Sequence, residues 1–126
     1  MVTVQEIERN QMIRSKYPAF AAGATSFAGV QIRNLATIGG NICNASPAAD
    51  SVPNLMALDA VVELRSVLGT RRLALQEFIL GNRKTARAEN ELVTALVIPR
   101  PSSKALGAFE KLGARKYLVI SIAMVG

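Results

Sequence analysis

The first thirty residues carry apolar side chains at helical spacing. The stretch Thr3-Val4-Gln5-Glu6 has the form of a capping box and predicts the start of a short helix. Pro18 suits the first turn of a further helix, which we expect to run over residues 19–28 and to end near Gly29. The apolar positions that define these helices are Ile7, Met12, Ile13, Phe20, Ala24 and Phe27.

The next thirty residues are less regular. Val30-Gln31-Ile32 is expected to be extended, and the residues after it lead into a glycine-containing loop. After Pro47 the pattern predicts a helix that has Asp50 or Ser51 near its N-terminus and ends near Asp59. We expect this helix to bury Leu55, Met56 and Leu58.

Strand patterns dominate from residue 61 onward. Residues 61–66 alternate and are rich in β-branched side chains, and Val67-Leu68-Gly69-Thr70 predicts a hairpin turn with a return strand over residues 71–74. A short helix is expected over residues 75–80, stopped by Gly81. The remaining predictions are a surface loop over residues 82–90 and strands over residues 91–98, 105–111 and 117–125. Hairpin-like strands with interspersed helices indicate an α+β fold.

Composition narrows the classes of function. The chain has 126 residues, half of them hydrophobic, so a real core is expected and disorder is not. The net charge of +6 is spread from Arg9 to Lys116. The only tight basic cluster, residues 83–87, has no interleaved aromatic residues, which argues against nucleic-acid binding.

Cysteine and histidine usage excludes several kinds of site. There is one cysteine, Cys43, and no histidine. The chain therefore cannot form an internal disulfide, and a reducing, cytoplasmic location is expected. Zinc and iron–sulfur sites built by this chain alone are not expected, nor are Ser–His or Cys–His catalytic pairs. The N-terminus does not resemble a signal peptide, and the uncharged stretch over residues 17–32 is too short and mixed to span a membrane.

The least ordinary stretch is Thr37-Ile38-Gly39-Gly40-Asn41. Adjacent glycines have no Cβ, so backbone amides here can approach a ligand closely and form a concave site for an anion such as a phosphate. Glycine pairs are equally common at tight turns that lead into a helix. Residue chemistry alone leaves both interpretations open.

A family resemblance bears on this choice. The run QIRNLATIGGNICNASPAAD, from Gln31 to Asp50, resembles the second flavin-binding motif of the molybdenum hydroxylases, in the FAD subunit or medium chain of xanthine dehydrogenase and carbon monoxide dehydrogenase type. Further stretches that resemble this subunit are residues 53–60, Gly69-Thr70-Arg71-Arg72, Phe78 to Thr85, Glu91 to Pro101 and Phe109 to Lys116.

The resemblance implies a fold and a division of the chain. Residues 1–101 are expected to form the second lobe of a two-lobed FAD-binding domain of the vanillyl-alcohol oxidase type, with a mainly antiparallel sheet and flanking helices. Residues 102–126 are expected to begin the α+β C-terminal domain of the flavin subunit. Nothing here resembles the first lobe with its Ala-Gly-Gly loop, because Ala22-Gly23-Ala24-Thr25 lies in a predicted helix before the second motif. We therefore expect a central piece of a larger subunit, either a cloned fragment or an interrupted reading frame.

The resemblance also implies a cofactor site without catalytic or metal-binding side chains. Phe27, Ala28 and Ile32 match positions that line the flavin, Val93 matches a flavin-contacting strand position, and Lys111 matches a basic residue of the C-terminal domain. The full set of implied FAD contacts is Phe27, Ala28, Ile32, Thr37, Ile38, Gly39, Gly40, Asn41, Asn44, Asp50, Val93 and Lys111. Asn and Thr side chains can bond phosphate or ribityl oxygens, and Asp50 can accept hydroxyl hydrogen bonds.

The implied function is electron transfer within an oxidoreductase. In this family FAD passes electrons from [2Fe–2S] clusters of a small subunit to an acceptor such as NAD, and a large subunit holds the molybdenum–pterin. The alternative is an inactive fragment or assembly module that does not hold FAD. Because half a cradle cannot enclose a dinucleotide, we expect the isolated chain to bind FAD weakly or not at all. We also expect self-association through exposed strand edges near Gly126.

Overall fold

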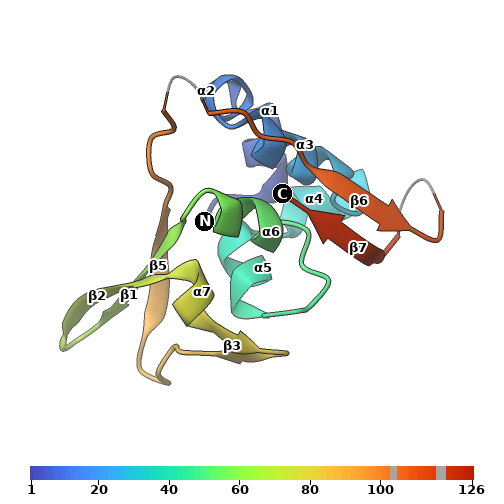
Figure 1. Cartoon of the computed structure of the whole chain (residues 1–126). Coiled ribbons are helices and arrows are strands. Elements are labelled where there is room, and N and C mark those ends of the chain that lie inside the picture. The colour runs from blue at the N-terminus through green and yellow to red at the C-terminus, as the bar shows by residue number, and fades with distance from the viewer. Residues whose placement is uncertain (103–104, 116–118) are drawn as a thin grey trace.

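The computed structural model describes residues 1–102, 105–115 and 119–126. Figure 1 shows helices packed between a sheet on one side and a separate hairpin on the other. Helices and antiparallel strands are mixed, as in an α+β fold, so the predicted fold class is confirmed. Within the described residues, no helix has the length and apolar character needed to cross a membrane.

Four short helices form the first part of the chain. They are α1 (Val4–Arg9), α2 (Gln11–Lys16), α3 (Pro18–Ser26) and α4 (Val30–Leu35). The predicted capping box opens α1: the Glu6 amide donates to Oγ1 of Thr3 at 3.1 Å, and the Thr3 amide donates to Oε2 of Glu6 at 2.6 Å. Pro18 stands in the first turn of α3, as predicted.

The prediction of an extended segment at residues 30–32 is wrong. These residues form the first half of α4, for which Gly29 is the N-cap. The Arg33 amide donates to the Gly29 carbonyl at 3.0 Å, and the Ala36 amide donates to the Ile32 carbonyl at 2.7 Å. Local helical hydrogen bonds therefore override the weak strand preference of the β-branched residues.

Two helices lie between the first helices and the sheet. They are α5 (Ile38–Cys43) and α6 (Val52–Ala57). The expected helix after Pro47 is present, and it buries Leu55 completely. Met56 is 37% exposed, which contradicts its predicted burial, because the residue after Leu55 is turned away from the core-facing side of the helix. Leu58, just past the end of α6, is half-buried.

The main sheet has the order β2-β1-β5 and is antiparallel throughout. Its strands are β1 (Val61–Ser66), β2 (Gly69–Ala74) and β5 (Leu92–Val97), close to the predicted bounds. The hairpin turn is tighter than predicted, because Gly69 already pairs with Ser66. Gly69 has φ +142, a conformation that favours glycine.

Short elements connect β2 to β5. The predicted helix before Gly81 ends early: α7 covers Leu75–Phe78 and is followed by β3 (Ile79–Gly81). The expected loop over residues 82–90 includes β4 (Lys84–Thr85), which pairs with β3. Part of the predicted loop therefore forms a short strand that pairs with the strand just before it.

The last two strands form a separate hairpin. They are β6 (Glu110–Gly113) and β7 (Ser121–Val125), and they pair antiparallel on the α3 and α4 side of the molecule (Figure 1). Residues 105–109 have no strand structure, so the predicted strand over residues 105–111 begins five residues late. The beginning of the other predicted strand, from Tyr117, lies outside the described residues.

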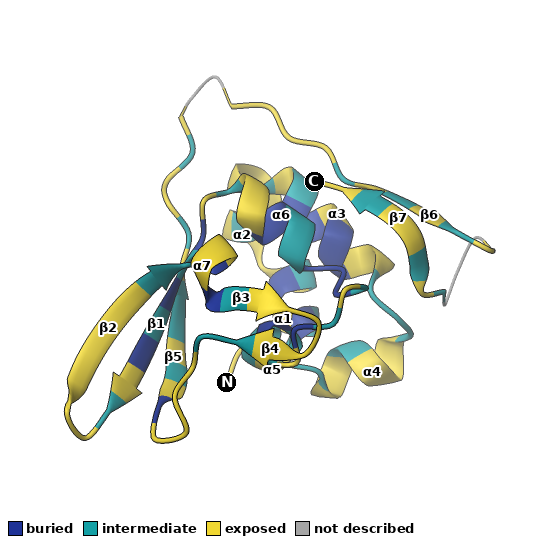
Figure 2. Ribbon diagram, turned by 60° about the horizontal axis from the view of Figure 1, so that its bottom comes forward, coloured by how far each residue is buried: buried dark blue, intermediate teal, exposed yellow. Residues whose placement is uncertain are grey.

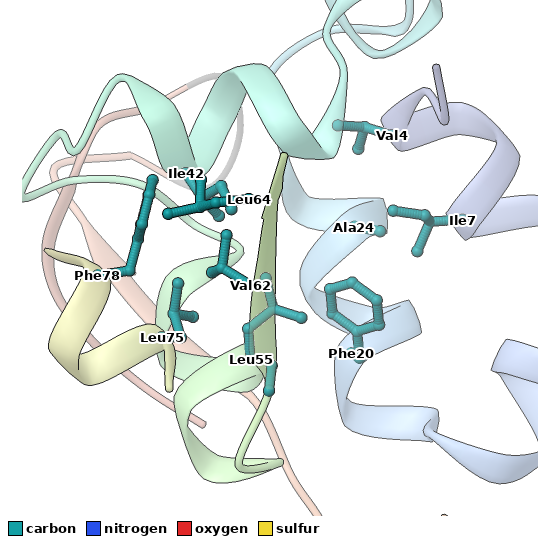
Figure 3. Close-up of a cluster of buried hydrophobic side chains, with 11 residues drawn as sticks. Val4, Ile7, Phe20, Ala24, Ile42, Leu55, Val62, Leu64, Leu75 and Phe78 are labelled. Carbon is teal, nitrogen blue, oxygen red and sulfur yellow. The ribbon is translucent and has the colours of Figure 1, made fainter. Parts of the chain in front are cut away.

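One hydrophobic core joins the sheet to the helices. Figure 2 shows buried residues in α1, α3, α6, α7 and the middle of β1. Figure 3 shows Phe78, Leu75 and Ile42 at one end of the cluster and Phe20, Ala24 and Ile7 at the other. Val62 and Leu64 of β1 are fully buried, so the inner face of the central strand is covered by helices.

Candidate functional site

The glycine pair lies in the first turn of α5 and not in a loop. Thr37 is the N-cap, and its Oγ1 accepts a hydrogen bond from the Gly40 amide at 3.1 Å. Gly39 and Gly40 have ordinary negative φ, so the left-handed conformation of a tight turn is not what they provide here. The expectation of a loop is therefore wrong for this stretch, and the helix explains why an N-capping threonine precedes the pair.

The pair instead keeps one side of α5 free of side chains. A Cβ at Gly39 would meet no atom within 4 Å, so its backbone borders open space. A Cβ at Gly40 would lie 3.0 Å from Oγ1 of Thr37, so a larger residue would crowd the cap. The Gly39 amide has no acceptor within the helix, and none elsewhere among the described residues.

A groove of about 540 Å³ runs between this bare side of α5 and β5. Val93, on the strand, faces the same groove as the glycine pair. The structure therefore brings together one group of sequence-predicted residues, namely Thr37, Ile38, Gly39, Gly40 and Val93. Cys43 and Arg87 also line the groove, although neither is in the set of FAD contacts that the resemblance implied.

Cys43 is half-buried beside Arg87. Burial raises the pKa of the Cys43 thiol above 9.0, and the Arg87 charge opposes this shift without cancelling it. The thiol is therefore protonated at neutral pH and behaves as a small apolar side chain in the groove wall.

A second hollow of about 930 Å³ lies between the α3–α4 connection and β6. Two of the predicted residues, Ala28 and Lys111, line it. Phe27 lies next to Ala28 but packs against the hydrophobic core. Ile32 is 53% exposed on α4 and lines neither hollow. The predicted flavin-lining residues are thus neighbours in the chain but do not share one surface.

Asp50 and Lys111 form an ion pair. Nζ of Lys111 donates to Oδ2 of Asp50 at 2.7 Å, and each side chain is only 9% exposed. The other oxygen, Oδ1 of Asp50, is buried and has no hydrogen-bond partner among the described residues. A buried acceptor without a donor is costly, so this atom fits a ligand hydroxyl or an ordered water.

The two predicted asparagines already have protein partners. Oδ1 of Asn41 accepts from the Ser51 hydroxyl at 2.5 Å, and Oδ1 of Asn44 accepts from Nη1 of Arg83 at 3.2 Å. Their amide nitrogens are therefore the atoms that stay available for a ligand oxygen.

Arg33 is a partly buried charged residue that sequence analysis did not select. It lines the larger hollow and contacts three oxygens of the protein. Its position inside the recognised motif was visible in the sequence, but the partners of its side chain are set by the fold. No group of three or more acidic, cysteine or histidine side chains is placed to hold a metal ion in the described parts of the chain.

Comparison with known proteins identifies the family. Residues 1–101 match the family model described as "FAD binding domain in molybdopterin dehydrogenase". The nicotinate dehydrogenase FAD-subunit of Eubacterium barkeri is 42% identical over 123 residues, which cover 95% of this chain and 42% of that protein. The xanthine dehydrogenase FAD-binding subunit of Escherichia coli O157:H7 is 34% identical over 106 residues, covering 84% of this chain and 36% of that protein.

A solved structure is similar over nearly the whole chain. Reconstituted CO dehydrogenase from Oligotropha carboxidovorans contains a chain that superposes with a TM-score of 0.91 at 32% sequence identity. The match covers 97% of this chain and 42% of the CO dehydrogenase chain. The protein thus spans less than half the length of the relatives that it matches.

Proposed function

The chain belongs to the FAD-binding domain family of molybdopterin dehydrogenases, and from this premise we propose that it forms part of the FAD site of a molybdenum hydroxylase-type oxidoreductase. In such an enzyme, bound FAD would carry electrons from [2Fe–2S] clusters to an acceptor such as NAD. The observation that carries the proposal is the groove beside α5, where Thr37, Gly39 and Val93 meet.

The groove fits the phosphate part of FAD. The unpaired amide of Gly39 can donate to a phosphate oxygen, and the missing Cβ lets that oxygen approach the backbone. Arg87 lines the same groove and adds a positive charge. Val93 supplies an apolar wall opposite the helix.

The larger hollow fits the flavin end. Ala28 and Lys111 line it, and Lys111 connects the hollow to Asp50, whose buried Oδ1 has an acceptor position left for an ordered water or a ligand hydroxyl. Lys111 belongs to β6, outside the residues that match the family model. In this proposal residues 1–101 form one lobe of the FAD-binding domain, and residues 102–126 contribute to the site from the next domain.

Completion of the site needs other polypeptide. The relatives are more than twice as long as the matched region, so we propose that a first FAD lobe, a molybdenum–pterin large subunit and an iron–sulfur small subunit are the partners. The second candidate function is an assembly module that keeps this fold without holding FAD. It is favoured by the Asp50–Lys111 ion pair, because Lys111 and one carboxylate oxygen of Asp50 already have partners within the protein.

The test is residue-resolved titration of the isotope-labelled chain by amide NMR, with ADP, which carries the diphosphate end of FAD, and FMN, which carries the flavin end, as two ligands that share one phosphate of FAD. ADP is expected to shift the amides of residues 37–40, FMN is expected to shift Ala28 and Lys111, and FAD is expected to bind more weakly than micromolar. Gly39→Leu covers the bare backbone and is expected to abolish the ADP shifts. Ala57→Leu, on the exposed side of α6, is the control and is expected to retain them.

The possible results separate the two functions. Absence of shifts with millimolar ADP, FMN and FAD would contradict the FAD site in this chain and favour the assembly module. ADP-induced shifts that persist in Gly39→Leu would show that the groove beside α5 is not part of the binding site. Sub-micromolar FAD binding by this chain alone would contradict the expectation that the site needs a second lobe.

A further inference from the structure

We propose that Arg33 is a positioning residue that fixes the Phe27–Ala28 turn against the larger hollow and thereby sets affinity for the flavin half of the cofactor. The inference rests on the proposed function, because it takes this hollow to be the flavin end of the site. Arg33 acts by holding the Phe27–Ala28 turn in place, and it need not contact the flavin itself.

The guanidinium group connects the turn to the protein by several hydrogen bonds. Nη1 of Arg33 donates to the Phe27 carbonyl at 3.0 Å and to the Ala28 carbonyl at 2.9 Å. Nε donates to Oε2 of Glu8 at 2.9 Å. One side chain of α4 thus joins the α3–α4 connection to α1.

The turn needs such support because its backbone is strained. Ala28 has φ +38, which is unfavourable for a residue with a Cβ. The carbonyls that accept from Arg33 follow the last turn of α3, where helical partners are lacking. Without the guanidinium group, both carbonyls would lose a charged donor, and no other described residue donates a hydrogen bond to either of them.

The Arg33–Glu8 ion pair is held rigidly because Glu8 belongs to a helix that packs in the core. Arg33 is 12% exposed and Glu8 is 23% exposed, so the ion pair is largely removed from water. Glu8 belongs to α1, whose Val4 and Ile7 are core residues. Because a half-buried charge is costly unless it is fully paired, the pair favours one geometry of the turn.

The geometry of the turn decides the shape of the larger hollow. Ala28 and Arg33 both line the hollow, together with Lys111 from the opposite wall. The groove beside α5 is lined by other residues, and Arg33 is not among them. Arg33 should therefore affect one half of the cofactor and not the other, which a purely structural residue would not do.

The experiment compares dissociation constants for FMN and ADP, measured by amide NMR on the 126-residue chain. Arg33→Gln is expected to weaken FMN binding by about tenfold or more, as for loss of charged hydrogen bonds, and to leave ADP binding within about twofold. Arg33→Lys keeps the charge but cannot span the three acceptors, so it is expected to weaken FMN binding as well. Arg14→Gln, on the exposed surface of α2, is the matched control.

Four results would overturn the inference. The first is unchanged FMN binding in Arg33→Gln while the unsubstituted chain binds FMN. The second is an equal loss of FMN and ADP binding, which would show a general structural role. If Arg33→Gln does not fold, Glu8→Gln is measured in its place. The third result is then unchanged FMN binding in Glu8→Gln. Absence of FMN binding by the unsubstituted chain would overturn the flavin end of the proposed function itself, and the inference with it.

Discussion

Asn54 is a buried polar side chain that lacks hydrogen-bond partners in the described part of the chain. It is 2% exposed, and neither amide atom has a hydrogen-bond partner among the described residues. The side chain projects from α6 against Gly23 of α3, where a Cβ would collide with Nδ2 of Asn54. Gly23 is thus required by a neighbour across the helix interface and not by its own backbone conformation.

This contact predicts that Gly23→Ala lowers stability when Asn54 is present and raises it when Asn54 is replaced by alanine. Gly23→Ala is expected to destabilise the unsubstituted chain by about 1–3 kcal/mol, as for overpacking. With Asn54→Ala also present, the same substitution is expected to stabilise by about 0.5–1 kcal/mol, because alanine is the better helix former. Urea unfolding of the four proteins in this cycle measures both values. Equal effects of Gly23→Ala in the two backgrounds would show that Asn54 is not the obstacle.

At the scale of elements, the start of β5 depends on a charge network. Nε and Nη2 of Arg71, on β2, donate to the two carboxylate oxygens of Glu91 at 2.6 and 2.8 Å. The Ala88 amide donates to Oε2 of Glu91 at 2.7 Å. The Arg71 hydrogen bonds, followed by the Ala88 amide, lower the pKa of Glu91 from 4.5 to about 2. The network spans the sheet, because β1 lies between β2 and β5.

The lowered pKa predicts how stability depends on pH. A carboxylate with a depressed pKa in the folded state stabilises the fold above the unfolded value of 4.5, and this contribution is lost as the pH falls toward about 2. Glu91→Gln is therefore expected to be less stable than the unsubstituted chain at pH 7, and the difference is expected to shrink between pH 4.5 and pH 2. Thermal unfolding across this range is the measurement. Glu89→Gln, exposed in the same loop, is the control, and a difference for Glu91→Gln that stays constant with pH would contradict the assignment.

At the scale of the whole molecule, the strand edges differ in charge. β2 carries Arg71 and Arg72 on an outer edge, where like charges oppose pairing with a second β2. β5 and β7 are also edge strands, and neither contains a charged residue. Ile122 and Val125 of β7 are 72% and 64% exposed, so this hairpin presents apolar side chains as well as unpaired backbone.

These edges predict concentration-dependent self-association of the chain. Light scattering after gel filtration is expected to show a dimer or larger species as concentration rises. Ile122→Lys is expected to shift the population toward monomer, because a lysine on an edge strand opposes pairing. Val67→Lys replaces an even more exposed apolar residue at the tip of the β1–β2 hairpin and is expected to have no effect. A monomer at high concentration in the unsubstituted chain would refute the prediction.

The sequence determined the features that depend on neighbouring residues. The capping box of Thr3 and Glu6, the helix start at Pro18 and the hairpin of β1 and β2 were predicted because each is fixed by local hydrogen bonds and backbone preference. The family was also identified from the motif over residues 31–50, since a long ordered match needs no knowledge of contacts.

Only the tertiary structure decided how those features are combined. The glycine pair lies in the first turn of α5, where the Gly39 backbone borders a groove. Val93 of β5 lines the same groove. Lys111 pairs with Asp50 across 61 residues of sequence, and Arg33 binds carbonyls of the preceding turn together with a carboxylate of α1. These arrangements depend on which helices and strands pack together, so local preference along the chain could not specify them.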